Sequence, residues 1–549
     1  MRASFFKRYF FLLILIPVAV VASVLLYTQR ELHKPVIEAI MPVSAETGDT
    51  ITIYGRNFGE LAGEARVEFN GVPVPRPSYL EWKDTSIRLI VPLLDKSPIV
   101  RVHTGFGFSK DKILVYKDNL PVLPEENAGQ MTGPVILALE ARDAVVGGLL
   151  VVRGYNFGIN RGASRVLFTT QTVLSTLDGG ASGISETIAA EDEDEFVSWS
   201  DKEIQIRIPD GAVSGPIWVN TLQGQSKPQF LQLNQKAGKK QFIAKRTYAL
   251  ESFTTISKIK AKQGGLMYLW RKMPATSVSQ RNVKVLESSY PALYSDKNIT
   301  CYLIRNVDPS AEYTIVQKYL LQNMSYTVEV SPDAISVPKT DLPSLYAKYT
   351  ARSDLVPSDS DAIREYAQNA VQFEKNPYRK ASLLLNALRK GYVVRQGRPD
   401  TPEQALSAKG GTVRSLVLLY TAGLRSLGVP ARPIAGVLVD DTRKAHEHYW
   451  CEFYIYGIGW IPVDPALYMG AITVEFSGPF SGPDKYFGSL DDRHIAFSQD
   501  MYKVARLLPE GKPSVTSKGW AFIDISEEYS AEIQSYTSFW SDIEVTGIY

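Results

Sequence analysis

HYWCEFYIYGIGWIPVDP, residues 448–465, places a His, a Cys and an Asp in one β-rich run that turns back at Gly-Ile-Gly. Side chains alternate faces along a strand, so His448 and Trp450 share one face and Cys451 points to the other. Cys451 therefore cannot serve His448 as a nucleophile, and we expect it to pack as a small apolar residue. We expect His448 and Asp464, in contrast, to meet as a hydrogen-bonded pair.

Helical patterns precede this hairpin. GGTVRSLVLLYTAGLRSLGVPARPIAGV, residues 410–437, has apolar residues at helical spacing from Val413 onward and stops at Gly428. Two earlier helices are expected, one around residues 363–371 and one that starts at Asn376-Pro377. Helices followed by antiparallel strands predict an α+β domain, which we place at residues 358–505.

The combination of these motifs resembles the transglutaminase-like core of the papain-like thiol enzymes. The matching blocks are Leu-Gly-Val-Pro-Ala-Arg at the helix end, His-Tyr-Trp on the strand, Gly-Trp leading to Asp464-Pro465, and KYFGSLDDRHIAFSQD at residues 485–500. The resemblance implies a Cys nucleophile at the start of the helix, with a His and an Asp on the strands. It also implies an amide substrate, either a Gln side chain or a peptide bond.

The position at which this resemblance places the nucleophile is occupied by Val413. A valine side chain cannot be deprotonated, and the nearby hydroxyls of Thr412 and Ser415 are offset in angle around the helix. We therefore expect a pseudoenzyme in which His448 and Asp464 are relicts and the domain serves binding or assembly. The alternatives are an active peptidase, amidase or acyl transferase with a non-Cys nucleophile, and a purely structural domain with a filled cleft.

Two aromatic residues and a second histidine are further candidates for a site. Trp450 and Trp460 are candidate substrate-binding residues, although large aromatics in a hairpin also serve as core. His446 lies on the same face as His448, but no third ligand is evident. We expect neither a metal nor a cofactor.

An internal repeat occupies the first half of the chain. ITIYGRNFG (51–59) recurs as LVVRGYNFG (150–158), and three later blocks recur in the same order. The repeat resembles two tandem IPT/TIG domains, which are small immunoglobulin-like β-sandwiches. A further β-rich segment precedes the helices. The expected boundaries are 35–117 and 133–234 for the repeats, 240–335 for a β-sandwich, and 506–549 for a C-terminal extension.

The N-terminus predicts a membrane segment. Arg2, Lys7 and Arg8 precede an uncharged run of about 20 residues, a length that spans a bilayer, within residues 1–30. The predicted fold class is therefore multidomain: a transmembrane helix, tandem all-β immunoglobulin-like sandwiches, a β-sandwich and an α+β transglutaminase-like domain. Whether the segment is cleaved as a signal peptide stays open.

The expected location is the bacterial inner membrane, with a single pass and the bulk of the protein in the periplasm. Lys plus Arg number 60 against 58 Asp plus Glu, a net charge of +2 that gives no electrostatic case for nucleic acid. The expected partners are the membrane and an envelope protein, peptide or glycan.

Overall fold

The computed structural model describes most of the chain: residues 32–41, 44–45, 48–61, 63, 65–91, 98–116, 133–175, 181–189, 195–296, 298–336, 343–397, 401–472, 474–480, 482–508, 510–515 and 518–549. The predicted membrane segment, residues 1–30, lies outside these ranges. Among the described residues, none of the helices has the length and apolar character needed to cross a bilayer. The chain divides into two compact units, residues 1–130 and 131–549.

The first unit is a β-sandwich. One sheet has the order β1-β3-β7-β6, with β1 at Val36–Met41, β3 at Thr50–Arg56, β7 at Ser86–Ile90 and β6 at Tyr79–Lys83. The other contains β10 (Lys112–Ile113), β8 (Ile99–Thr104), β4 (Arg66–Phe69), β5 (Val72–Pro73) and β9 (Gly107–Phe108), and β2 (Ser44–Ala45) pairs with β11 (Val115–Tyr116). A short 3₁₀ turn, η1, covers Arg76–Ser78. Ile51 and Ile53 alternate inward along β3, so the apolar alternation of the sequence builds the core.

The second repeat opens the second unit with the same strand order. Its first sheet runs β12-β13-β17-β16, at Val135–Ala141, Leu149–Tyr155, Glu203–Arg207 and Phe196–Trp199. The remaining strands are β14 (Arg165–Ser175), β15 (Ala181–Ala189), β18 (Gly215–Thr221), β19 (Gly224–Gln225) and β20 (Gln229–Leu231). The duplication seen in the sequence is therefore a duplication of structure.

The repeated Gly-x-Asn-Phe-Gly motif forms the same turn in both copies. Asn57 and Asn156 adopt positive φ angles of 61° and 63°, a conformation that Asn tolerates better than most residues. A Cβ atom at Gly55 or Gly154 would lie 1.9 Å from the carbonyl oxygen of the neighbouring first strand. Both glycines are thus required by the close approach of two backbones.

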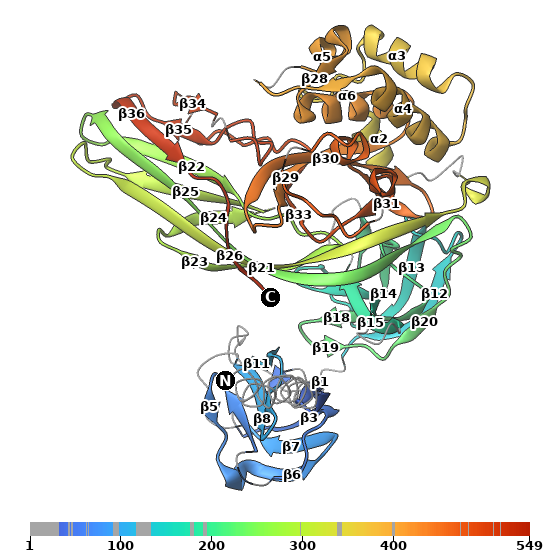
Figure 1. Cartoon of the computed structure of the whole chain (residues 1–549), viewed down its shortest axis with the longest axis vertical. Coiled ribbons are helices and arrows are strands. Elements are labelled where there is room, and N and C mark those ends of the chain that lie inside the picture. The colour runs from blue at the N-terminus through green and yellow to red at the C-terminus, as the bar shows by residue number, and fades with distance from the viewer. Residues whose placement is uncertain are drawn as a thin grey trace, which may run out of the picture. The chain divides into compact units, whose positions relative to one another are not determined.

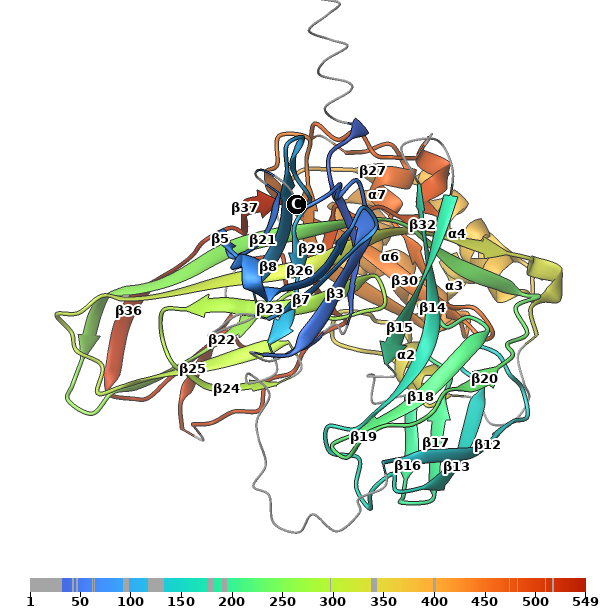
Figure 2. The same ribbon diagram turned by 90° about the horizontal axis from the view of Figure 1, so that it is seen from below.

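A long β-sandwich follows, and the C-terminus completes it. β21 (Gly238–Ala261) pairs with β26 (Tyr313–Val330), which pairs with β23 (Gln280–Ser288). The other layer has the order β24-β25-β22-β35-β34, at Ala292–Asp296, Ile299–Arg305, Leu266–Lys272, Glu527–Tyr529 and Lys512–Ser514. β36 (Ile533–Trp540) and β37 (Glu544–Ile548) pair with β21, as Figure 2 shows for β36. The C-terminal extension therefore belongs to this sandwich.

The last domain is α+β, as predicted. Its sheet has the order β31-β30-β29-β33, at Gly459–Val463, Ala445–Ile455, Ala431–Val439 and His494–Gln499. The helices are α2 (Leu345–Thr350), α3 (Asp361–Val371), α4 (Pro377–Gly391), α5 (Pro402–Ala408), α6 (Val413–Ser426) and α7 (Pro465–Tyr468). Short elements complete the domain: β27 (Val393–Val394), β28 (Gly410–Gly411), β32 (Ser489–Leu490), η4 (Pro332–Ala334) and η5 (Pro483–Tyr486).

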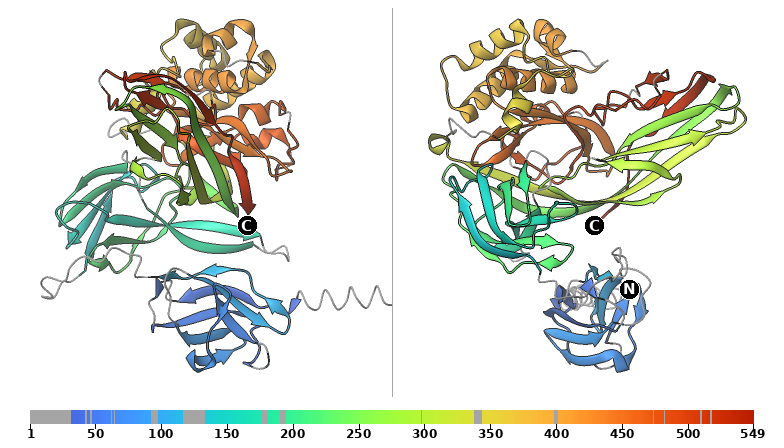
Figure 3. Two further views of the ribbon diagram at one scale, coloured as in Figure 1. Left: turned by 90° about the vertical axis from the view of Figure 1, so that its left-hand side faces the viewer. Right: turned by 180° about the vertical axis from the view of Figure 1, so that it is seen from behind.

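Helix α6 is the central element of this domain. Nearly all of it is buried, and it packs on β29 and β30 on one side and on α3, α4 and α5 on the other. Figures 1 and 3 show these helices gathered on one side of the sheet. The packing fixes the N-terminus of α6 beside β30.

Candidate functional site

A cleft opens where the N-terminus of α6 meets β30. Its volume is about 370 Å³, which is large enough for a small ligand. Val413 and His448 both border it. The described residues that line it are Val394, Arg395, Gln396, Gly397, Thr412, Val413, Arg414, Leu438, His446, Glu447, His448, Tyr449, Ala471, Ile472 and Val474.

The cleft follows a strand edge. β31 pairs with β30 only over residues 451–455, and consecutive residues 446–449 of β30 line the cleft. Consecutive residues of a strand point to opposite faces, so a space that all four border lies along the edge of the strand. This is the edge of β30 that β31 leaves unpaired.

The start of α6 is capped by its own residues. Thr412 is the N-cap, and its Oγ1 accepts a hydrogen bond from the backbone N–H of Ser415 at 3.2 Å. Ser415 is fully buried, and its hydroxyl donates to the carbonyl oxygen of Thr412 at 2.9 Å. The hydrogen bonds among the described residues include none from either hydroxyl to His448. Both hydroxyls therefore serve the helix cap.

Val413 is the first residue of α6 and is half-buried at the cleft wall. Its backbone N–H belongs to the first turn, where helical N–H groups have no acceptor within the helix. This is the position at which the family resemblance requires a nucleophile, and an isopropyl group stands there instead.

His448 and Asp464 meet as the sequence indicated. Nε2 of His448 lies 2.5 Å from Oδ2 of Asp464, and both residues are buried. Asp464 is also the N-cap of α7, where its Oδ1 accepts from the backbone N–H of Leu467 at 2.9 Å. The Asp464 carboxylate does not border the cleft, and its hydrogen bond fixes the orientation of the His448 ring in the cleft wall.

A second histidine, which sequence reasoning missed as a site residue, completes the buried group. Nε2 of His494 lies 3.0 Å from the same Oδ2 of Asp464, and Nδ1 lies 2.8 Å from Oδ1 of Asp491. Tyr486 donates its hydroxyl to Oδ2 of Asp491 at 2.8 Å. The sequence signal for this histidine is the Asp-x-x-His spacing of Asp491 and His494 within KYFGSLDDRHIAFSQD.

Gly436 makes this convergence possible. It pairs with His448 on one side and with Ala496 of β33 on the other. A Cβ there would lie 2.1 Å from the carbonyl oxygen of Ile495. The missing side chain lets β33 approach closely and brings His494 to Asp464.

The buried group holds its charges through mutual attraction. Burial acts to raise the pKa of Asp464, but the charges and hydrogen bonds of His448 and His494 outweigh it and hold the pKa far below its usual value. Burial acts to lower the pKa of His494, but Asp491 and Asp464 outweigh it and raise that pKa to about 9. His494 is thus a cation at neutral pH that sits between two carboxylates.

Three of these side chains form the one candidate metal-ligand set in the described part of the chain. One ligand atom each from His448, Asp464 and His494 lies within 4.8 Å of the others. Neighbouring ligands of one transition metal stand about 3 Å apart, whereas the His448–Asp464 separation is 2.5 Å. The arrangement as it stands is hydrogen-bonded rather than spread around an ion.

Cys451 faces away from the cleft. It is fully buried among the residues that pack α6 on the sheet, and burial raises the pKa of its thiol well above the usual value. The other cysteine, Cys301, is buried in the β-sandwich, where burial raises its pKa to about 12. Neither thiol has the character of a nucleophile.

Neither candidate tryptophan borders the cleft. Trp450 is buried beneath His448, in a cluster with Tyr326 of the preceding sandwich. Trp460 lies against Tyr349 and Tyr454, with ring centroids 5.0 and 5.4 Å away. Both rings therefore serve the core.

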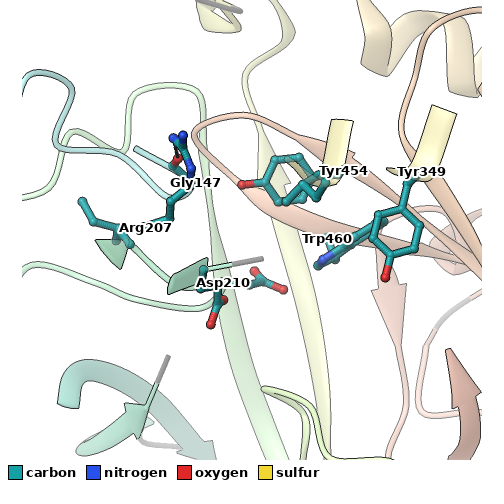
Figure 4. A pocket seen from close by; sticks show the side chains of 9 residues that line it. Gly147, Arg207, Asp210, Tyr349, Tyr454 and Trp460 are labelled. Carbon is teal, nitrogen blue, oxygen red and sulfur yellow. Dashed lines mark hydrogen bonds between the residues drawn. The ribbon is translucent and has the colours of Figure 1, made fainter. Parts of the chain in front are cut away.

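Trp460 lies near the second repeat. It borders a small cavity that Asp210 also borders (Figure 4). The volume of this cavity is about 20 Å³, room for about one water molecule. The guanidinium carbon of Arg432 lies 4.0 Å from the Trp460 ring centroid, and Arg432 also pairs with Glu452 at 2.8 Å. Asp210 in turn pairs with Lys240 at 2.6 Å. This polar cluster joins the transglutaminase-like domain to the second repeat.

His446 belongs to a separate pair. Its Nε2 lies 2.7 Å from Oδ2 of Asp440, whose Oδ1 accepts from the backbone N–H groups of Thr442 and Lys444. His446 therefore stabilises the β29–β30 turn, and it is not a member of the candidate metal set.

The fold and the His–Asp pair define the class of this domain as transglutaminase-like. Residues 364–465 match the family model described as the transglutaminase-like superfamily, and residues 35–115 match the IPT/TIG domain. The chain thus contains a transglutaminase-like domain and an N-terminal IPT/TIG domain. The comparison with curated proteins found no match.

Solved structures give distant similarities. One is described as a "Putative Cysteine Protease from Cytophaga hutchinsonii", with 12% identity over 56% of this chain and 91% of that one, at a TM-score of 0.35. Another is SGBP-B from a xyloglucan utilization locus in Bacteroides uniformis, with 12% identity over 54% and 99%, at 0.15. A third is the surface glycan-binding protein PbSGBP-B from Prevotella bryantii, with 9% identity over 53% and 98%, at 0.14. At such TM-scores these similarities carry no argument about function.

Proposed function

We propose that the transglutaminase-like domain binds an envelope ligand in its cleft without turning it over, within a protein anchored in the bacterial inner membrane. The observation that carries the proposal is Val413, which lines the same open cleft as His448. A thiol-enzyme mechanism needs a nucleophile at the helix start, and valine has no atom that can attack a carbonyl.

The alternative of a hydroxyl nucleophile finds little support. Thr412 and Ser415 hold the start of α6 through each other, and a serine or threonine needs an adjacent base to become nucleophilic. His448 is the base that the site offers, and no hydrogen bond of the described residues joins it to either hydroxyl. A purely structural role would leave the open cleft unexplained.

The first prediction separates binding from turnover. The full chain, purified in detergent, should release no ammonia from Gln-containing peptides and cleave none of them. It should bind peptidoglycan-derived stem peptides saturably in isothermal titration calorimetry. His448→Ala should weaken that binding about tenfold, because a hydrogen bond to a charged group contributes about 1.5 kcal/mol.

Lys444→Ala is the matched control, since this exposed side chain lies on the same hairpin outside the lining. Turnover that Asp464→Ala abolishes would establish an active enzyme and overturn the proposal. A failure of both peptides and envelope glycans to bind would leave only a scaffold role.

The second prediction concerns the anchor. The full chain should stay in the membrane pellet after alkaline carbonate extraction, whereas a variant without residues 1–30 should not, because the apolar run is long enough to span a bilayer. Protease added outside the inner membrane should degrade the body of the protein. Release of the full chain into the soluble fraction would indicate cleavage of the segment or no anchoring at all.

A further inference from the structure

Two arginines border the cleft at the N-terminus of α6, where the backbone N–H of Arg395 donates to the carbonyl oxygen of Gly411 at 2.8 Å. Arg395 and Arg414 both line the cleft, and neither guanidinium has an ion-pair partner among the described residues. Arg395 is exposed and donates to the carbonyl oxygen of Ala408 at 3.2 Å, whereas Arg414 is half-buried with its guanidinium 5.8 Å from the ring centroid of Phe522. Both charges are available to a ligand.

Backbone groups at the same end add to this positive potential. Val413 and Arg414 are the first two residues of the fourteen-residue helix α6. Because both residues lie in the first turn, their backbone N–H groups have no acceptor within the helix. A helix N-terminus with unsatisfied N–H groups favours an anion.

The remaining charges in the lining offset this potential only in part, since one acid among the described lining residues opposes two arginines. His448 has Nε2 committed to Asp464, which leaves Nδ1 for a ligand. His446 is paired with Asp440. Glu447 is the one acid among the described residues of the lining, and its carboxylate accepts a hydrogen bond from the backbone N–H of Gly519 at 2.8 Å.

Resting on the proposed binding function, we propose that the cleft recognises the free C-terminal carboxylate of a peptide. The carboxylate would lie at the N-terminus of α6 between Arg414 and Arg395, a planar anion that guanidinium groups match in shape and charge. The chain leading to it would lie along residues 446–449 of β30, whose outer edge β31 leaves unpaired. A strand edge binds extended peptide through backbone hydrogen bonds, which favours a peptide over a glycan as the source of the carboxylate.

The test compares peptides that differ only at the C-terminus. The full chain in detergent is titrated with stem peptides that end in a free carboxylate and with the same peptides amidated. The acid should bind at least tenfold more tightly than the amide. Arg414→Gln and Arg395→Gln should each weaken binding of the acid by about tenfold and leave the amide unchanged.

Controls keep this test independent of folding and of the binding function. Arg364→Gln, a charge-matched change on α3 outside the lining, should bind the acid as the wild type does. Arg395 is exposed, so its variant should fold even if Arg414→Gln does not. Equal affinity for acid and amide would overturn the carboxylate inference while the binding function stands. Binding of an oligosaccharide uronate but not of the peptide acid would overturn the assignment to a peptide.

Discussion

Asp464→Ala should lower the local free energy of unfolding of the transglutaminase-like domain by about 3–5 kcal/mol, the range for breaking a buried ion pair by removing one partner. Asp464 is fully buried and accepts from both His448 and His494 while it caps α7. Its removal leaves a buried histidine cation with one carboxylate fewer.

Native-state hydrogen exchange is the suitable measurement, because a multidomain chain has no single free energy of unfolding. Amides of β30 and β33 should lose protection in Asp464→Ala, whereas amides of the first unit should not change. Asp484→Ala is the control: it removes a carboxylate that is 74% exposed and paired with Arg389. It should lower the free energy of unfolding by less than about 1 kcal/mol. Equal protection in both variants would contradict the account of the buried group.

The pH dependence follows from the sign of the His494 shift. Its pKa is raised from 6.5 to about 9 in the folded state, so the associated stability is present in full below about pH 6.5 and is lost as pH rises through about 9. Protection of β33 should therefore fall between these values in the wild type. In Asp464→Ala this loss of β33 protection with rising pH should be smaller, because His494 has lost one of the two carboxylates that raise its pKa.

Local rules and motif spacing were enough to predict part of the site. Strand alternation placed Cys451 away from His448, and the hairpin spacing paired His448 with Asp464; the structure has both features. The helical period of residues 413–427 gave α6, and Gly428 ends it with a φ of 75°. These inferences need only contacts within one element or one hairpin.

The parts that the sequence did not reveal depend on pairings distant along the chain. His494 reaches Asp464 only because β33 pairs with β29 beside Gly436. Trp450 is core because Tyr326, from a different domain, covers it. The pairing of β36 with β21 joins residues more than 270 positions apart, such as Ile533 and Ala261. No local pattern signals such partners.

Val413→Cys should give the cleft a thiol that reacts with electrophiles. A thiol at the first position of α6 would lie at the positive end of the helix and across the cleft from His448, both of which favour the thiolate. Iodoacetamide should label residue 413 at pH 6 at least tenfold faster than it labels a solvent-exposed cysteine. The wild type should stay unlabelled because Cys301 and Cys451 are buried.

The central claim is that His448 and Asp464 form an intact catalytic frame that lacks only its nucleophile. The most direct measurement is the labelling rate of Val413→Cys with and without His448→Ala, with Val413→Ser as the unreactive matched control. The account predicts that removing His448 slows labelling at residue 413 at pH 6 by at least tenfold. A rate that does not depend on His448 would contradict it.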